Sequence, residues 1–197
     1  MEIQGLVFLY VVILFSAVIH EYFHAWTADM LGDSTARMAG RLTVNPLKHI
    51  DLWGTVVLPL FMMFVFRIFI GYAKPVPFNP YNIKYKHGAL LVGVAGPAAN
   101  ILIAIIFGFV LRLFFFASPF GSFIALIVYV NIFLALFNLI PIPPLDGSRL
   151  ITEILPYRWR IMWQDSFIGI FIAVMIAFWI LPKIVPFLFL LIAGQSF

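Results

Sequence analysis

The sequence contains no cysteine and few charged residues, and both absences limit what the protein can be. Without cysteine there are no disulfides and no thiolate ligands, so any bound metal must be held by histidine and carboxylate side chains. Only 10% of the 197 residues are charged, and the 12 lysines and arginines form no cluster of the kind that binds nucleic acid. The chain is 64% hydrophobic, with a mean hydropathy of +1.09. These values exclude an ordinary soluble domain and predict a protein that crosses the lipid bilayer several times.

Long apolar runs cover most of the chain. A helix needs about 20 mostly apolar residues to cross a membrane. The candidate runs are residues 5–27, 52–71, 89–111, 122–140 and 167–192. The last of them is interrupted by Pro182, Lys183 and Pro186. We therefore predict an all-α polytopic membrane protein, in which a bundle of about four to five transmembrane helices forms a single membrane-embedded domain over residues 1–197.

The lysines and arginines between these runs indicate that the second run does not cross the membrane. Loops that face the cytoplasm are enriched in these residues. Three basic residues occur in each of three loops, namely residues 29–51, 72–88 and 141–166. These loops share one side only if residues 52–71 form a membrane-embedded hairpin, which suits the proline at position 59. We expect a short, proline-rich extended segment at residues 74–78 to follow, and the C-terminal end of the first helix to face the cytoplasm.

A zinc-protease signature lies at the end of the first apolar run. Residues 20–24 read His-Glu-Tyr-Phe-His, which is the pattern H-E-x-x-H. In a helix His20 and His24 share one face, so both imidazoles can bind one metal ion, and Glu21 can act on a water molecule beside it. An acidic residue near the middle of a membrane helix costs about 2.5–3.5 kcal/mol, which a bound cation offsets. The alternative interpretation is that these polar groups form hydrogen bonds between helices.

A catalytic zinc ion usually has three protein ligands, so a third is expected elsewhere in the chain. The other histidines, His49 and His87, lie in polar loops. Asp146 is the better candidate, because it follows the fourth apolar run after a proline-rich stretch that ends the helix. The neighbouring Gly147 gives the backbone freedom to turn the carboxylate towards the helix bundle. The alternative is that Asp146 caps the N-terminus of a helix that begins at Gly147.

Several motifs, in order along the chain, resemble those of the site-2 proteases, a family of intramembrane zinc metalloproteases. Residues 20–24 match its zinc-binding helix, residues 96–100 its G-P-x-x-N element, and residues 138–147 its N-x-x-P…L-D-G element. Residues 41–51 and 71–77 resemble stretches of its short prokaryotic members, which have no PDZ or nucleotide-sensing domain. The resemblance covers about residues 15–149.

The resemblance implies a role for each residue of these motifs. His20, His24 and Asp146 would bind Zn²⁺, and Glu21 would be the catalytic acid and base. Asn138 would hold the substrate strand, and we assign Asn100 to substrate binding as well. Hydrogen bonding between helices is the alternative for Asn100, and it is the interpretation we favour for Asn131.

The function predicted from these observations is an intramembrane zinc endopeptidase of the cell membrane of a prokaryote. It would cleave transmembrane segments of membrane proteins near the cytoplasmic side, for signalling or for clearance, and we expect no nucleic-acid partner. A rival class of membrane metalloprotease would use a glutamate as the third ligand, and Glu153 is the only glutamate after Glu21. A metal-binding transporter or scaffold that cuts nothing would need the two histidines but not Glu21.

Overall fold

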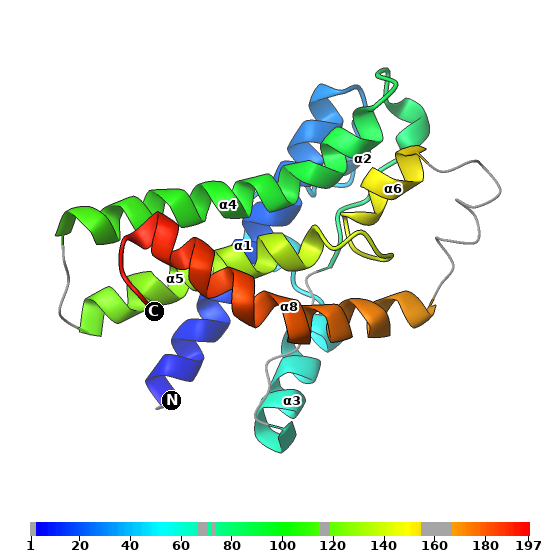
Figure 1. Cartoon of the computed structure of the whole chain (residues 1–197). Coiled ribbons are helices and arrows are strands. Elements are labelled where there is room, and N and C mark those ends of the chain that lie inside the picture. Colours follow the sequence, from blue (N-terminus) through cyan, green and yellow to red (C-terminus); the bar gives the residue numbers. More distant parts are fainter. Residues whose placement is uncertain (1–2, 67–70, 72–73, 115–118, 155–166) are drawn as a thin grey trace. The chain divides into compact units, whose positions relative to one another are not determined.

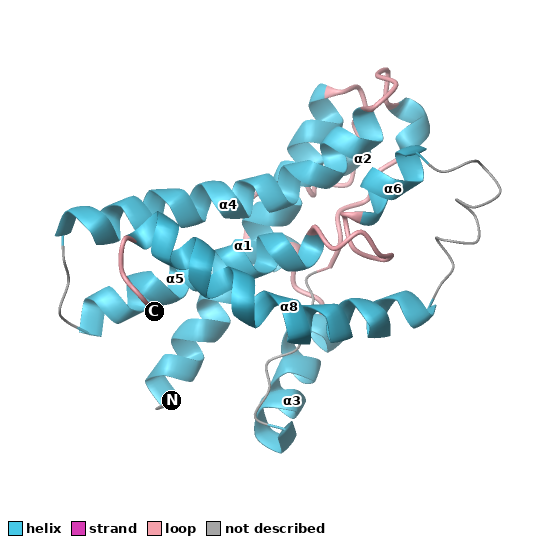
Figure 2. Ribbon diagram, viewed as in Figure 1, coloured by secondary structure: helices cyan, strands magenta, loops and turns pink. Residues whose placement is uncertain are grey.

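The computed structural model describes residues 3–66, 71, 74–114, 119–154 and 167–197. Within these ranges every regular element is a helix and there is no strand (Figure 2). The prediction of an all-α protein is therefore confirmed. The chain divides into two compact units, Met1–Gly88 and Ala89–Phe197, whose elements are labelled in Figure 1. A single domain over the whole chain stays a prediction.

The first unit begins with α1 (Ile3–Met30), which carries the H-E-x-x-H turn. The helix runs through the whole first apolar segment, which contains no proline. It ends in a Schellman motif, in which Gly32 N–H donates to the Asp29 carbonyl (3.1 Å) and Asp33 N–H donates to the Ala28 carbonyl (2.9 Å). Gly32 has a φ of 111°, a conformation that glycine adopts without steric cost. This turn sends the chain away from α1 two turns of helix after the signature.

Short helical elements make up the loops of the first unit. They are α2 (Thr35–Met38), η1 (Pro46–Lys48) and η3 (Pro80–Asn82). An asparagine caps each of the two single turns that start with proline. The Asn45 side chain accepts from Leu47 N–H at 3.0 Å, and the Asn79 side chain accepts from Tyr81 N–H at 3.1 Å. The loops on both sides of the predicted hairpin are therefore ordered by local hydrogen bonds.

The described part of the second apolar run forms a helical stretch that is shorter than a membrane span. It consists of η2 (Leu52–Val57), a π-helical turn, and α3 (Leu58–Phe66). Asp51 caps its start by accepting from Gly54 N–H at 2.7 Å. Further on, a Cβ atom on Gly71 would lie 2.5 Å from Cγ of Pro59 and 3.0 Å from the Gly54 carbonyl oxygen. The chain thus returns to the start of this stretch, as expected of a hairpin, and its embedding in the membrane stays a prediction.

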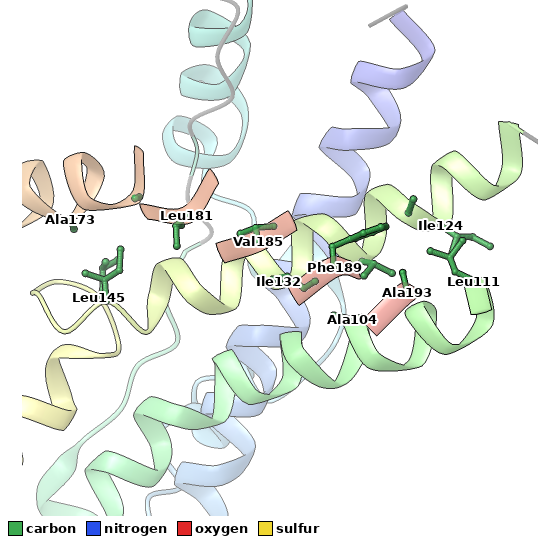
Figure 3. Packing of buried hydrophobic residues seen from close by; sticks show 14 residues of the cluster. Ala104, Leu111, Ile124, Ile132, Leu145, Ala173, Leu181, Val185, Phe189 and Ala193 are labelled. Atoms are coloured by element: carbon green, nitrogen blue, oxygen red, sulfur yellow. The ribbon is translucent and has the colours of Figure 1, made fainter. Parts of the chain in front are cut away.

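The second unit is a packed group of helices: α4 (Gly88–Phe114), α5 (Pro119–Asn138), α6 (Ser148–Ile154) and α8 (Phe167–Ala193). Its core lies mainly between α5 and α8, where Ile132, Val185 and Phe189 are fully buried (Figure 3). Small residues let the helices approach closely, since a Cβ atom on Gly108 would lie 2.3 Å from Cγ2 of Ile192. This packing fixes the end of α5, after which the loop with Asp146 begins.

Four helices of the described chain are long and apolar enough to cross a membrane. They cover Ile3–Met30, Gly88–Leu113, Phe120–Asn138 and Gly169–Ala193. Their number agrees with the predicted bundle of about four to five helices. The last one passes without a break through Pro182 and Pro186, where the sequence suggested an interruption. Proline is tolerated in membrane helices because local adjustments and neighbouring groups satisfy the backbone groups that it frees.

Candidate metal centre

The two histidines of the signature lie on one face of α1 and meet through their Nε2 atoms. His20 and His24 are buried, with 6% and 8% of their surface exposed. Their Nε2 atoms are 3.0 Å apart, and their rings lie edge to face with centroids 4.6 Å apart. One turn of helix separates them, so the backbone of α1 alone brings these two nitrogens together.

This pair fits two ligands of a zinc ion. Zinc–nitrogen bonds of about 2.0–2.1 Å at a tetrahedral angle place two ligand nitrogens about 3.3 Å apart. The Nε2 atoms of His20 and His24 already approach this spacing at 3.0 Å, inside the protein and in a helix of membrane-spanning length. Imidazole nitrogens are also ligands that zinc prefers. The histidine pair therefore has the donor chemistry and the spacing of a zinc site.

Glu21 points to the loop that follows the hairpin. Its Oε2 atom accepts a hydrogen bond from the backbone N–H of Val76 at 2.9 Å. Its other oxygen, Oε1, has no hydrogen-bond partner among the described residues. The sequence predicted an extended segment at residues 74–78 but not its contact with Glu21. The pattern Pro75-Val76-Pro77 is a signal that could have suggested it, since it leaves one backbone donor between two prolines.

The extended segment is held in place at both ends by the preceding loop. Lys74 N–H donates to the His49 carbonyl at 2.9 Å, and Asn79 N–H donates to Asp33 Oδ2 at 2.7 Å. Arg41 Nη2 donates to the carbonyls of Lys74 (3.1 Å) and Pro75 (3.2 Å). The segment belongs to no sheet within the described chain, so side chains and single backbone contacts take the place of a strand ladder.

Asp33 is the anchor at the C-terminal end of that segment. The residue is fully buried, and its carboxylate accepts from Thr35, from Asn82 Nδ2 at 2.9 Å and from Asn79 N–H at 2.7 Å. Burial alone raises the pKa of this carboxyl group. The hydrogen bonds from Thr35, Asn82 and Asn79 outweigh burial and hold the pKa of Asp33 below its ordinary value. Asp33 therefore stays ionised and links the end of α1 to the loop at residues 79–82.

Asp146 lies in the second unit, in a tight loop between α5 and α6. Gly147 N–H donates to the Asn138 carbonyl at 2.7 Å and closes the loop. A Cβ atom on Gly147 would lie 2.2 Å from the Leu139 carbonyl oxygen, so only glycine fits there. The helix that follows begins at Ser148, one residue later than the capping interpretation assumed. The role of Asp146 as the third ligand stays a prediction.

The two asparagines assigned to substrate have different surroundings. Asn138 is half-buried at the end of α5, where its Nδ2 donates to the Leu134 carbonyl at 2.9 Å. Asn100 is fully buried, and its Nδ2 donates to Asn131 Oδ1 at 2.8 Å. Asn131 Nδ2 donates in turn to the Ile127 carbonyl at 2.9 Å. The Asn100–Asn131 bond joins α4 to α5, which is the contact that the interhelical interpretation expects, while substrate binding by Asn100 and Asn138 stays a prediction.

Comparison with known proteins decides the family. The model of peptidase family M50 matches residues 115–182, a stretch that includes Asn138 and Asp146 but not α1. The chain is 35% identical to "Putative zinc metalloprotease YwhC" of Bacillus subtilis, over 76% of this chain and 69% of that protein. The chain belongs to peptidase family M50. This family is that of the site-2 proteases, so the resemblance seen in the motifs is confirmed.

Other M50 relatives are longer than the part that this chain matches. "Putative zinc metalloprotease Rip2" of Mycolicibacterium smegmatis is 34% identical over 68% of this chain and 52% of that protein. "Putative zinc metalloprotease MJ0611" of Methanocaldococcus jannaschii is 35% identical over 52% of this chain and 55% of that protein. The chain thus spans about half the length of these two relatives. No solved structure matches this M50 chain significantly.

Proposed function

We propose that this M50 protein is an intramembrane endopeptidase that cuts transmembrane segments of other membrane proteins near the cytoplasmic side of the cell membrane, for signalling or for clearance. Its family and the names of its relatives make it a metalloprotease whose ion is zinc. Four helices of spanning length make it a multi-pass membrane protein. The relatives come from prokaryotes, which supports a prokaryotic cell membrane as its location.

The observation that carries this proposal is the placement of the signature. His20 and His24 present Nε2 atoms 3.0 Å apart on a buried face of a membrane-length helix, and Glu21 lies in the same turn. Two imidazoles and a carboxylate in one turn are costly in a membrane unless a cation binds there. A transporter or scaffold would gain from the two imidazoles, and it could use the carboxylate at the same turn only as a further metal ligand. Hydrolysis uses all three groups.

The proposed ligands are His20, His24 and Asp146, with Glu21 as the acid and base. A zinc ion held by these residues would act as a Lewis acid, which would polarise the peptide carbonyl and make a nearby water molecule more acidic. Glu21 takes a proton from the attacking water and later gives it to the departing amine, so its carboxylate carries the proton from the nucleophile to the leaving group. Oε1 of Glu21 is the oxygen left for this work, because Oε2 is bonded to Val76 N–H.

The substrate must be unwound before it can be cut. A transmembrane helix keeps its carbonyls in its own hydrogen bonds, where no nucleophile reaches them. We propose that Asn138 and the extended segment at residues 74–78 hold the unwound chain. Asn138 is suited to this by its place at the end of α5, next to the loop with Asp146. If Asn138→Ala cleaved a transmembrane substrate at the wild-type rate, this role would be wrong.

Cleavage by purified protein tests the proposal. A protein with one transmembrane segment is incubated with the wild type and with Glu21→Gln, and bound zinc is measured in both. We expect the wild type to cut, the variant to be at least about 10³-fold slower, and both to hold about one zinc per chain. If both proteins hold zinc and neither cuts any of a panel of substrates, the protein is a metal-binding transporter or scaffold.

A matched pair of variants tests the third ligand. Asp146→Asn and Glu153→Gln each replace a carboxylate of the second unit by its amide, and they differ little in size. We expect Asp146→Asn to lose zinc and Glu153→Gln to keep it, because a neutral amide is a poorer zinc ligand than a carboxylate. The opposite result would assign the protein to the rival arrangement with Glu153 as ligand.

A reporter fused after Tyr81 tests the orientation in the membrane. We expect this position to face the cytoplasm, because residues 72–88 carry three of the basic residues. A reporter located outside the cell would show that the second apolar run crosses the membrane, and it would remove the argument for cleavage near the cytoplasmic side.

A further inference from the structure

The backbone donors around Glu21 are few, and those of residues 74–77 are all in use. Pro75 and Pro77 have no N–H, which leaves the N–H groups of Lys74 and Val76. Lys74 donates to the His49 carbonyl at 2.9 Å, and Val76 donates to Glu21 Oε2 at 2.9 Å. The two prolines also favour the extended backbone that points the Val76 N–H away from its own chain. This stretch therefore presents one donor to Glu21 and no competing one.

We propose that the Val76 N–H is the group that positions the Glu21 carboxylate for proton transfer, and that Arg41 is a positioning residue that holds this N–H in place. The proposal rests on the proposed function, in which Glu21 is the acid and base. It assigns a role to backbone and side-chain groups that lie 55 and 20 positions from Glu21 in the sequence.

The reason lies in the freedom of a glutamate side chain. A glutamate has three rotatable bonds, and a catalytic carboxylate must stay close to one geometry to transfer protons efficiently. A hydrogen bond from an N–H to a carboxylate is among the stronger ones, because the acceptor is charged. The bond to Oε2 fixes the rotation of the carboxylate and leaves Oε1 for the water molecule. Without it the side chain samples other rotamers and spends less time in the reactive one.

Arg41 can hold the donor because it binds the backbone just before Val76. Its Nη2 donates to the carbonyls of Lys74 and Pro75, at 3.1 and 3.2 Å, and its Nη1 donates to the Lys48 carbonyl. One guanidinium thus ties residues 74 and 75 to the loop at residue 48. The fixed fork of arginine suits several carbonyls at once, whereas the single ammonium of lysine does not.

The same contacts limit how the segment can bind substrate. A chain that pairs with residues 74–77 finds both N–H groups occupied, so it can pair only through its own N–H groups. This narrows the proposed strand-like contact with substrate to the carbonyl groups of the segment, of which those of Lys74 and Pro75 already accept one hydrogen bond each from Arg41. The segment can therefore position Glu21 through its Val76 N–H and accept hydrogen bonds from substrate through its carbonyl groups at the same time.

Proline at position 76 removes the donor and keeps an extended backbone. In Val76→Pro we expect kcat to fall by about tenfold or more, with KM within about twofold and the zinc content unchanged. Val76→Ala is the matched variant, because it shortens the side chain and keeps the N–H. Its kcat should lie at least about fivefold above that of Val76→Pro. Equal kcat values for the two variants would show that the Val76 N–H does not contribute to catalysis.

Amide hydrogen exchange measures the hydrogen bond without measuring activity. In peptides that cover residues 74–80, only Lys74, Val76, Phe78 and Asn79 carry an amide hydrogen, because the other three residues are prolines. In Glu21→Ala we expect the Val76 amide to exchange at least about tenfold faster than in the wild type. Glu21→Gln keeps an acceptor oxygen, so its Val76 amide should stay close to the wild type although cleavage is lost. Unchanged exchange in Glu21→Ala would overturn the proposal, even where Val76→Pro fails to fold.

Arg41 variants test the second half of the proposal. We expect Arg41→Ala to lower kcat about fivefold and to speed exchange at Lys74 and Val76, with zinc retained. Arg41→Lys should recover only part of kcat, since one ammonium cannot replace the fork. Wild-type kcat in Arg41→Ala would remove Arg41 from the proposal. Failure of the proposed function would look different, because neither the wild type nor Glu21→Gln would then cut any substrate, while the exchange rates would still measure the bond between Val76 N–H and Glu21.

Discussion

Two buried polar pairs lie in the membrane-length helices of this protein, and they are satisfied in different ways. Asn100 and Asn131 come from two helices and match as donor and acceptor, with a further bond from Asn131 to the Ile127 carbonyl. His20 and His24 come from one helix and face each other through the same kind of atom, Nε2. Two neutral imidazoles can share only one N–H between these atoms. The asparagine pair is complete as it stands, whereas the histidine pair gains most from a cation that accepts both lone pairs.

The difference shows how polar groups in a membrane helix can be interpreted. A polar side chain there needs a partner, and its type does not show whether that partner is another helix or a ligand. The geometry of the pair shows which kind of partner it is. Complementary donors and acceptors indicate packing, while like acceptor atoms that converge indicate a bound cation. Changing one member of each pair tests this contrast, because only the histidine change should remove a bound cation.

Removal of one imidazole should break the site completely. In His24→Ala we expect zinc to be lost and cleavage to fall by at least about 10³-fold, because a catalytic zinc needs three protein ligands. Zinc analysis of the purified protein and a cleavage assay measure both effects. Asn131→Ala is the control from the other pair, and it should keep its zinc. Full zinc binding by His24→Ala would mean that the histidine pair is not a metal site.

A change beside Asp146 tests the third ligand without altering any ligand. In Gly147→Ala the new Cβ atom would clash with the Leu139 carbonyl oxygen, so the loop must shift. A displacement of about 1 Å in a catalytic group can cost about 10²-fold in rate. We therefore expect cleavage about 10²-fold slower and weaker zinc binding, measured by competition with a chelator. Gly40→Ala is a control, since a Cβ atom there meets nothing within 4 Å, although its φ of 64° adds some strain. Wild-type zinc affinity in Gly147→Ala would argue against Asp146 as a ligand.

Asp33 extends the comparison to a buried charge outside the membrane-spanning helices. Since hydrogen bonds hold the pKa of Asp33 below its ordinary value, the carboxylate adds stability above that value and loses it as the pH falls through the lower folded pKa. We expect the Tm of the wild type to decrease when the pH is lowered below about 4, and we expect a smaller decrease in Asp33→Asn. At pH 7 the variant should lose about 1–3 kcal/mol, because the amide mismatches the donors around it. If the Tm of Asp33→Asn depended on pH as the wild-type Tm does, the ionised Asp33 would not be what links the end of α1 to the loop at residues 79–82.

Much of the fold and part of the site could be predicted from the sequence. The apolar runs at residues 89–111 and 122–140 predicted α4 and α5 with ends that differ by a few residues from those of the structure. They could do so because a helix of membrane length must be apolar nearly throughout. The H-E-x-x-H pattern correctly predicted that His20 and His24 lie on one face of α1, because residues four apart in any helix do. The continuity of α8 through two prolines was missed, because proline breaks helices in water more strictly than in a packed membrane protein.

The contact between Val76 and Glu21 could not be predicted in the same way. The two residues are 55 positions apart, and their meeting depends on how the loop folds between residues 31 and 82. That fold rests on Gly32, on the buried Asp33 and on the contacts of Arg41, none of which has a periodic signal. Local patterns predict helices and ligands on one turn, whereas a backbone donor 55 positions away requires the structure.

The hydrogen bond of the asparagine pair itself should contribute little to stability. Single changes Asn100→Ala and Asn131→Ala, with the double variant, form a cycle whose coupling energy should be about 0.6 kcal/mol, the average for hydrogen bonds in a membrane protein. Unfolding of the purified protein in mixed detergent measures it, and zinc content should not change. Double variants at His20 and His24 cannot give such a value, because either single change already removes the ion that both bind. A coupling near zero, with cleavage lost in Asn100→Ala, would move Asn100 from helix packing to the substrate site, and the contrast between the two pairs would have to be abandoned.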